Sequence, residues 1–532
     1  MKKIIITAIT AATLIVANAQ NEDDALRFSM DRFSGTARSV ALGGAMGALG
    51  GDLSSIAINP AGIAVYRSSE FTFTPSLMLN KTNTSYHGNS NIEDRYSLPF
   101  QEIGFVGTYK PIREATNGIV SSHFSIGYNR TNSFSRSLYL HGDNMQYSLL
   151  DRFTHDANAG RLGGIYKDVL EKSWLLYEEA GYVNAFEFLY PNNEVGFGPL
   201  SGIDQVTAVR ERGNAGEFHF AGGLNISNKF MLGASLGINS FNYSRKTQHF
   251  EAVSGYSYAN WYGWEYYEYQ ATCDPSGVGL DKFTFSDNLS TVGVGVNLKV
   301  GVIYKPINAI RIGAAFHSPV FYSIDEDFST SARADYFYVD ISDDGSEYLF
   351  EPAPSKGDKK YGDFKYNFRT PLKGVGSVAF ILGKMGLISI DYEYVDYSSM
   401  RFATNNSDLL HDMEIKEMNK PIPLTFKETH NFRFGAEFRP SEIFTLRGGY
   451  GMYQSPYRKE FLNADNKHQT FSFGFGYRMN NMFIDVAYML RQEKYLYSFY
   501  NLDDVFYIQE KPQSADITSN NHQMAVTLGW RF

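Results

Sequence analysis

The sequence predicts an all-β protein: a transmembrane antiparallel β-barrel of about fourteen strands, with a small N-terminal hatch in its lumen and a helical external loop. Three observations lead to this prediction. Aromatic residues and glycine are abundant, with 41 Phe, 37 Tyr and 48 Gly among 532 residues. Segments in which apolar and polar residues alternate recur along the chain. After the N-terminus, no apolar run reaches the roughly 18–20 residues of a spanning helix, which excludes a helical membrane protein.

The composition excludes further classes of protein. A single cysteine, Cys273, leaves no internal disulfide framework and no cysteine-rich metal site. The net charge of −9 gives no electrostatic reason to bind nucleic acid. The sequence contains no HExxH metal motif and no GxSxG nucleophile motif. We therefore expect no cofactor, no metal centre and no enzymatic activity.

Residues 1–19 have the features of a cleaved signal peptide. Lys2 and Lys3 precede an apolar stretch at 4–16, and Ala17-Asn18-Ala19 is a small-x-small cleavage site. A buried N-terminal strand or helix is the alternative interpretation. An exported chain with aromatic, alternating segments is expected in the outer membrane of a bacterial cell.

The last ten residues predict a terminal barrel strand. One face carries Met524, Val526, Leu528, Trp530 and Phe532, and the other carries small or polar residues. A terminal Phe on such a strand resembles the segment that the bacterial barrel-insertion machinery reads, so this machinery is an expected partner. The same alternation facing the core of a soluble sandwich is the alternative.

Similar alternation places the barrel at 69–532. Charged residues recur on the face opposite the apolar one, as a polar lumen and a lipid-facing exterior require. Short connections (227–229, 305–309, 383–385, 439–442 and 479–482) alternate with long ones, which is typical of a barrel with one periplasmic and one external rim. The predicted strands begin near Glu70, Phe100, Ser122, Glu217, Phe230, Thr291, Ile310, Gly374, Leu387, Thr429, Phe444, Thr470, Phe483 and Asn521.

Residues 20–68 precede the first strand and are rich in small side chains. The run 35–52 is dominated by Gly and Ala and leads to Asn59-Pro60-Ala61-Gly62. Small residues allow the backbone to pack closely inside a narrow lumen. A phosphate-binding loop is the rival interpretation, but no GxxxxGK[ST] motif occurs. This segment is therefore predicted to be a hatch.

The glycine-rich run leading into Asn59-Pro60-Ala61-Gly62 resembles the hatch of the FadL-type outer-membrane transporters. Two further segments, 301–319 and 370–398, are also similar to that family. The resemblance implies a fourteen-stranded barrel plugged by the hatch, and passive uptake of hydrophobic compounds, long-chain fatty acids foremost. It also implies external capture, a hatch-gated lumen and lateral release into the membrane. Outer-membrane lipid and lipopolysaccharide are the expected surroundings.

The insertion at 141–215 has helical periodicity. Leu149, Leu150 and Phe153 share one predicted helical face, and Trp174 lies on another. The resemblance suggests that this external loop captures ligand. The alternative is that these faces pack on each other and on the barrel rim.

Two features of the strands are candidates for the transport route. Gly127 and Asn129 interrupt the alternation of the third strand and are candidates for a kink that opens the wall. Inward cations could pair with a carboxylate head group, or they could brace the lumen together with Asp391, Glu393, Glu437 and Asp485. These cations are Lys299, Arg311, Arg433, Arg447 and Arg478.

Other chemistry in the sequence is weak. Asp340, Asp344 and Glu351 match the spacing of a calcium loop, but an acidic hairpin is the alternative. A secretion or surface-attachment adaptor is the second functional hypothesis, because some FadL-type barrels serve protein export. An outer-membrane lipase is the third and would need a Ser/His pair near the outer leaflet.

Overall fold

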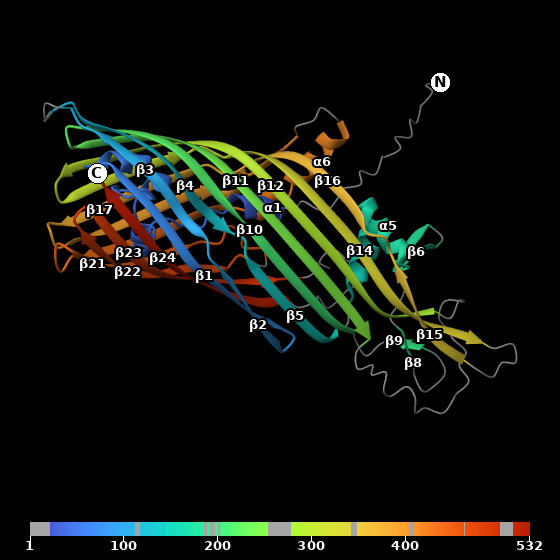
Figure 1. Cartoon of the computed structure of the whole chain (residues 1–532). Helices are drawn as coiled ribbons and strands as arrows, with labels where there is room; N and C mark the ends of the chain where they lie inside the picture. The colour runs from blue at the N-terminus through green and yellow to red at the C-terminus, as the bar shows by residue number, and fades with distance from the viewer. Residues whose placement is uncertain are drawn as a thin grey trace, which may run out of the picture.

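The chain forms a closed β-barrel whose strands have alternating side chains. Along the wall strands, buried and exposed residues alternate, so one face points into the barrel and the other outward (Figure 1). Fourteen antiparallel strands form the closed ring, which confirms the predicted fold class. The structure is a computed structural model that describes residues 22–111, 117–145, 147–179, 181–185, 189–191, 197–199, 203–253, 278–341, 348–404, 409–461, 463–498, 500 and 514–532.

The ring closes where the last strand pairs with the first, with Glu70 opposite Arg531. Its strands in order are β1 (Glu70–Tyr86), β3 (Phe100–Tyr109), β4 (Ile119–Ser133), β10 (Ile203–Ile226), β11 (Phe230–Val253), β12 (Val278–Ile307), β13 (Ile310–His317), β17 (Lys373–Leu382), β18 (Gly386–Asp396), β20 (Glu428–Phe438), β21 (Phe444–Tyr453), β22 (Lys467–Met479), β23 (Met482–Tyr497) and β24 (Ala515–Arg531).

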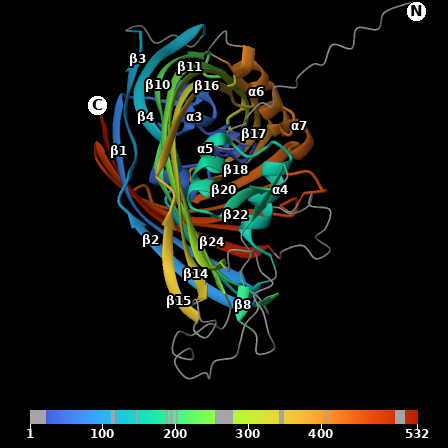
Figure 2. The same ribbon diagram turned by 90° about the vertical axis from the view of Figure 1, so that its right-hand side faces the viewer.

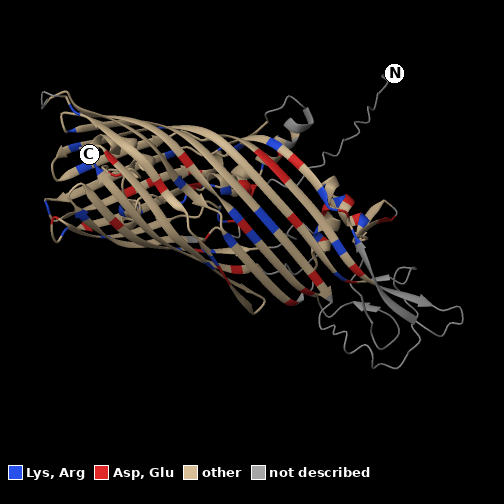
Figure 3. Cartoon of the chain, in the orientation of Figure 1, with Lys and Arg blue, Asp and Glu red and all other residues tan. Residues whose placement is uncertain are grey.

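Exposed apolar side chains surround the barrel near the end that carries the C-terminus. Outward positions of β10, β11, β12 and β22 carry Phe, Leu, Ile or Val, whereas their inward neighbours are small or polar. The ribbon of this end is mostly uncharged, and charged residues become frequent from the middle of the barrel onward (Figure 3). Such an apolar belt is what contact with a lipid bilayer requires.

Several strands continue far beyond this belt. β12 has 30 residues and β11 has 24, whereas a membrane-spanning strand needs about 9–11. The wall is extended by β2 (Asn89–Ser97), β5 (Arg136–Met145), β14 (Phe321–Ile341), β15 (Tyr348–Lys356), β16 (Lys360–Arg369) and β19 (Arg401–Ala403), and two small hairpins are β6 (Leu176–Glu179) with β7 (Tyr182–Ala185) and β8 (Leu189–Pro191) with β9 (Phe197–Pro199). The alternation in the sequence does not predict these strands, so the external extension is a finding of the structure.

Proline marks the step from barrel to extension at two places. The chain leaves β13 at His317 and enters β14 at Phe321, with Pro319 between them. Pro371 similarly separates β16 from β17. Because proline cannot donate to a ladder, the strand pairing is interrupted at both places.

A seam interrupts the wall above β3 and β4. There β2 pairs with β1, and β5 pairs with β10, but no backbone ladder joins β2 to β5 in the described part of the chain. Side chains of β1, the neighbour of β2, contact the other side of the seam instead: Asn80 donates to the Ser135 carbonyl at 2.8 Å, and Thr84 donates to the Tyr139 carbonyl at 2.6 Å. The strand interruption lies at Phe134 and Ser135, between β4 and β5.

The N-terminal segment runs inside the barrel. It contains α1 (Glu22–Ser29), α2 (Ala37–Ala41), α3 (Ser55–Ile58) and the 3-10 helix η1 (Pro60–Val65). We call 37–66 the hatch and 22–34 the strap. The hatch is buried over almost its whole length and contacts strands around the ring, with α2 against β21–β24 and η1 against β10, β11 and β12.

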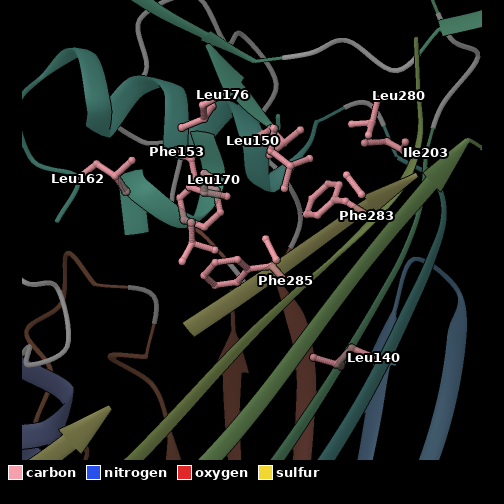
Figure 4. Packing of buried hydrophobic residues seen from close by; sticks show 14 of the residues in the cluster. Leu140, Leu150, Phe153, Leu162, Leu170, Leu176, Ile203, Leu280, Phe283 and Phe285 are labelled. Atoms are coloured by element: carbon pink, nitrogen blue, oxygen red, sulfur yellow. The ribbon is translucent and has the colours of Figure 1, made fainter. Parts of the chain in front are cut away.

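Short helices cover the open side of the extension (Figure 2). α4 (Leu149–Asn158) and α5 (Gly164–Lys172) pack their apolar faces on the inner side of the extended strands, where Leu150, Leu170 and Phe283 are buried together (Figure 4). The 3-10 helix η3 (Tyr397–Ser399), α6 (Leu409–Asn419) and α7 (Ile422–Thr425) lie on the other side. Among the described residues, no helix has the length and apolar character needed to cross a membrane.

Candidate functional site: a charged cavity above the hatch

A cavity of about 780 Å³ lies inside the barrel on the external side of the hatch. Ala57 and Ile58 of the hatch form part of its lining, and the strap runs along it. Asn129, Thr131 and Arg136, on either side of the interruption between β4 and β5, also line it. The cavity therefore lies between the hatch and the seam.

The lining of this cavity is strongly polar. Its cations are Arg27, Arg32, Arg130, Arg136, Arg245, Lys299, Lys373, Arg433 and Lys494, and its anions are Glu22, Asp23, Asp31, Glu211, Glu217, Glu393 and Glu493. Tyrosines at 397, 453, 457, 495, 497 and 500 supply much of the remaining surface. A tyrosine ring offers an apolar body with a polar tip, so this lining suits a molecule with both apolar and charged parts.

Aromatic packing fixes the strap in the lumen. Phe28 stacks on Phe241 with ring centroids 4.4 Å apart, and its edge meets Tyr243 and Phe368. The guanidinium of Arg27 lies 4.5 Å from the ring centre of Tyr243. α1 is thus held against the inner face of β11, which positions its acidic first turn beside the cavity.

Two ion pairs anchor the end of the strap to opposite walls. Asp31 pairs with Lys373 on β17, and Arg32 pairs with Glu493 on β23 at 2.9 Å. The Arg32 backbone N–H also donates to the Thr131 carbonyl at 2.8 Å. Thr131 sits at the register shift of β4, so the strap is bonded directly to the strand whose continuation forms the seam.

Two buried carboxyl groups beyond the membrane belt remain ionised because of their partners. Burial opposes ionisation of Glu211, but Arg136 at 2.6 Å, with Arg27 nearby, lowers its pKa to about 2. Burial also opposes ionisation of Glu493, yet Arg32, His468 and Arg491 lower its pKa to about 2. Both groups are therefore anionic at neutral pH.

Arg433 is one of three cavity cations with a buried donor that lacks a hydrogen bond among the described residues; Arg130 and Arg245 each have an unbonded Nε. Arg433 lies 3.4 Å from Glu393 and 3.9 Å from Asp391, yet its Nε and Nη2 atoms are buried without a hydrogen bond among the described residues. Guanidinium donors left without acceptors are costly when buried. Two of the Arg433 donor atoms therefore lack an acceptor in this arrangement of the cavity.

The hatch motif seals against two glycines of the wall. Asn59 donates to the carbonyls of Gly47 at 2.7 Å and Val302 at 3.1 Å, and its own Oδ1 caps η1 by accepting from Ala61. Pro60 occupies the first turn of η1. A Cβ on Gly301 would lie 2.0 Å from Asn59 Oδ1, and one on Gly233 would lie 2.2 Å from the Pro60 carbonyl oxygen. Glycine at these two wall positions therefore allows Asn59 and Pro60 to lie against the wall.

The predicted lumen cations bond mostly to protein partners. Lys299 pairs with Glu217 at 2.6 Å, and Arg311 donates to the Leu49 carbonyl of the hatch at 2.6 Å. Arg447 pairs with Glu437 at 2.9 Å and Asp485 at 2.5 Å. Arg478 has no side-chain bond among the described residues, and of the five only Lys299 and Arg433 line the cavity.

Three of the four external-loop residues that were predicted to capture ligand pack in a hydrophobic core. Leu150 is 2% exposed and Phe153 is 9% exposed, both within the core of α4, α5 and the extended strands, and Leu149 packs against the same core. Trp174 is 50% exposed and adopts a positive φ of 60°. This arrangement agrees with packing for three residues and leaves Trp174 on the surface.

Two smaller predictions concern the kink in the third strand and the calcium loop. β4 continues through Gly127 and Asn129 with a regular register to β3 and β10, so a kink there stays a prediction; the strand ends later, before Phe134 and Ser135. Asp340 lies opposite Leu349 and Glu351 opposite Tyr338 in the β14–β15 hairpin, which favours a strand pair over a calcium loop. Asp344 and the signal segment 1–19 lie outside the described residues.

Solved structures of outer-membrane transporters have a similar architecture. The chain is 12% identical to the toluene transporter TodX of P. putida, with a TM-score of 0.51 over 93% of this chain and 98% of that one. It is 12% identical to a FadL homologue of Pseudomonas aeruginosa, with a TM-score of 0.53 over 95% and 100% of the two chains. The chain has the FadL-type transporter fold. No family model and no curated protein matches its sequence.

Three parts of this FadL-type barrel escaped sequence reasoning. The strap was read only as part of the hatch segment, although Arg32 and Phe28 reach opposite walls. The polar strand β2 has no buried face, so its sequence gave no alternation signal. The cavity tyrosines come from distant strands and loops, and no local pattern unites them.

Proposed function

We propose that this protein is an outer-membrane transporter for the passive uptake of hydrophobic compounds with an anionic head group, long-chain fatty acids foremost. The observation that carries this proposal is the cavity of about 780 Å³ inside a FadL-type barrel, between the hatch and the seam. Cations and tyrosines in one cavity suit a carboxylate joined to an apolar chain.

Ligand binding begins at the external end. A long acyl chain gains roughly 0.8 kcal/mol per CH₂ on leaving water, so exposed apolar or aromatic surface suffices for first contact. Trp174 provides such surface beside α5. Leu149, Leu150 and Phe153 support the capture surface from beneath by holding α4 on the extended strands.

Arg433 is the proposed partner of the carboxylate in the cavity. Its Nε and Nη2 atoms have no hydrogen-bond acceptor among the described residues, and two parallel donors match the two oxygens of a carboxylate. Lys299 and Lys373 are already paired with Glu217 and Asp31, so they would contribute mainly to the electrostatic potential of the cavity. The apolar chain would lie against the tyrosine rings.

The hatch and the seam are the proposed exits. The hatch is held by Asn59 and by the Arg38–Glu437 pair at 3.3 Å, and a shift of this segment would open the lumen toward the periplasm. The seam is joined by side chains alone, so opening it costs no backbone ladder. The bond between Arg32 and Thr131 couples the strap to the strand beside the seam.

Uptake of labelled oleate by cells that lack their own transporter tests this proposal. Cells carrying the barrel should accumulate oleate faster than cells carrying an empty vector, and Arg433→Gln should lower the rate by about tenfold while the folded protein remains heat-modifiable. Equal uptake with and without the folded barrel would reject oleate transport and favour the adaptor function.

A further inference from the structure

The outer surface beside the seam carries a row of basic side chains. Arg210 on β10 lies directly opposite Lys246 on β11, and Arg212 follows two positions along β10. All three side chains are exposed, whereas their neighbours Val209 and Glu211 are buried in the lumen, so the three point outward.

Arg95 is half-buried and lies opposite Asn80 on β1, and it reaches this row from the other side of the seam. Its Nη1 donates to Ser137 Oγ on β5 at 3.3 Å, and Ser137 lies opposite Arg210 in the β5–β10 ladder. Ser137 therefore separates Arg95 from Arg210. Burial, followed by the charges of Arg212 and Arg210, lowers the pKa of Arg95, which agrees with this proximity.

These four residues, which we call the seam cations, form no ion pair among the described residues, although the charge of Glu93 acts on Arg95. The bond from Arg95 to Ser137 is their one side-chain hydrogen bond in the described part of the chain. Like charges directly opposite on neighbouring strands destabilise a sheet. Folding alone gives no reason for the Arg210–Lys246 pair, so an external anion is the expected partner.

The position of the seam cations selects the kind of anion. On β10 the outward residues change from Phe218 and Phe220, in the apolar belt, to Arg212 and Arg210 beyond it. A side chain at this depth meets the head groups of the outer leaflet. On the other side of the extension the outward residues at this level include the exposed acids Asp325, Asp327 and Asp363, which would repel the same head groups.

We propose that the seam cations bind the phosphorylated sugar head group of an outer-leaflet glycolipid. Arginine forks bind phosphate through two parallel hydrogen bonds, and neighbouring strands separated by about 4.8 Å place several forks within reach of one head group. The bound lipid would bridge β2 and β10 and so hold the seam together. This inference rests on the proposed outer-membrane location and not on transport.

The test is binding of bisphosphorylated lipid A to the purified full-length barrel in neutral detergent, measured by native mass spectrometry. Wild-type protein should retain one lipid A, and Arg210→Gln/Arg212→Gln should bind at least tenfold more weakly. Arg95→Gln, on the other edge of the seam, should also weaken binding. The control Arg333→Gln/Lys365→Gln removes the same charge from residues that lie beside Asp335 and Asp325 and should bind like wild type.

Three further probes identify the source of the recognised group. Dephosphorylated lipid A should bind weakly, phosphatidylglycerol should bind less tightly than lipid A, and millimolar inorganic phosphate should not displace the lipid. Equal binding by the double variant, equal binding of the dephosphorylated lipid, or full displacement by phosphate would each overturn the proposal. Cold gel mobility confirms that each variant is folded, and oleate uptake is measured separately, so failure of the transport proposal leaves this result readable.

Discussion

At the scale of single residues, a few polar side chains decide whether the lumen is closed. Asn59 holds two carbonyls and caps η1, although a resemblance was the sole reason to single it out. Glu437 accepts from Arg38, Arg439 and Arg447, so one carboxylate joins hatch and wall. Each such residue has several bonds, and losing one leaves buried partners unsatisfied.

Replacing Asn59 by Ala should loosen the hatch. The change removes a helix cap worth about 0.5–2 kcal/mol and leaves the Gly47 and Val302 carbonyls without their donor. We expect a larger and noisier ion conductance in planar bilayers. Asn520→Ala, on the outer face of β24, is the control and should conduct like wild type; identical traces for both variants would contradict this role of Asn59.

The pKa of Glu493 predicts how pH acts on the strap. Its folded pKa of about 2 lies below the ordinary 4.5, so its stabilising effect is present above pH ~4.5 and is lost as the pH falls through about 2. The midpoint difference between wild type and Glu493→Gln, measured as heat-modifiability on gels, should stay constant from about pH 7 to about pH 5. It should then shrink toward pH ~2. A difference that vanishes near pH 5 would show that Glu493 is not held by Arg32.

At the scale of elements, the sequence predicts the wall strands, which share one repeating pattern, and does not predict the extension strands, which lack it. Alternation located all fourteen wall strands, because one lipid-facing surface imposes period two on each of them. The extensions β5, β14 and β16 face packed helices on one side and water on the other, and Pro319 and Pro371 separate β14 and β16 from the membrane strands, so their pattern in the sequence is weaker. Gly127 interrupts the alternation of the third strand in the sequence, yet it packs against Gly104 and His219 within an unbroken strand.

The fit between hatch and wall gives an element-level prediction. Gly301→Ala places a Cβ 2.0 Å from Asn59 Oδ1, so η1 must move away from β12. We expect increased conductance and faster proteolysis of the N-terminal segment. Gly376→Ala meets no atom within 4 Å and should behave like wild type. Unchanged proteolysis of Gly301→Ala would argue against tight docking of the hatch.

Linking β1 to the residue that precedes β5 locks the seam and so tests the proposed lateral release. In a Cys273→Ser background, Asn80→Cys and Ser135→Cys can be linked by a short bifunctional thiol reagent, because Asn80 bonds to the Ser135 backbone. Linked protein should lose most oleate uptake and unlinked protein should retain it. Tyr488→Cys/Met524→Cys, a cross-strand pair in the continuous wall, is the matched control. Full uptake through a linked seam would place the exit elsewhere.

At the scale of the whole molecule, the barrel combines a closed membrane wall with an uneven external half. The ring is sealed by ladders all the way round, whereas the extension is tall from β10 to β16 and open at the seam. Inside the barrel, the cavity lies on the external side of the hatch, and the strap runs along the cavity. The proposed route would follow this order, and the charged lining suits the head group of the proposed ligand.

The most direct test of this route is oleate uptake with paired variants in one transporter-deficient strain. The wild-type barrel should raise uptake, Arg433→Gln should lower it, and Asn59→Ala should change it, while Asn520→Ala leaves it unchanged. If folded wild-type barrel gives no more uptake than the empty vector, the cavity does not carry fatty acids and the transport proposal is wrong.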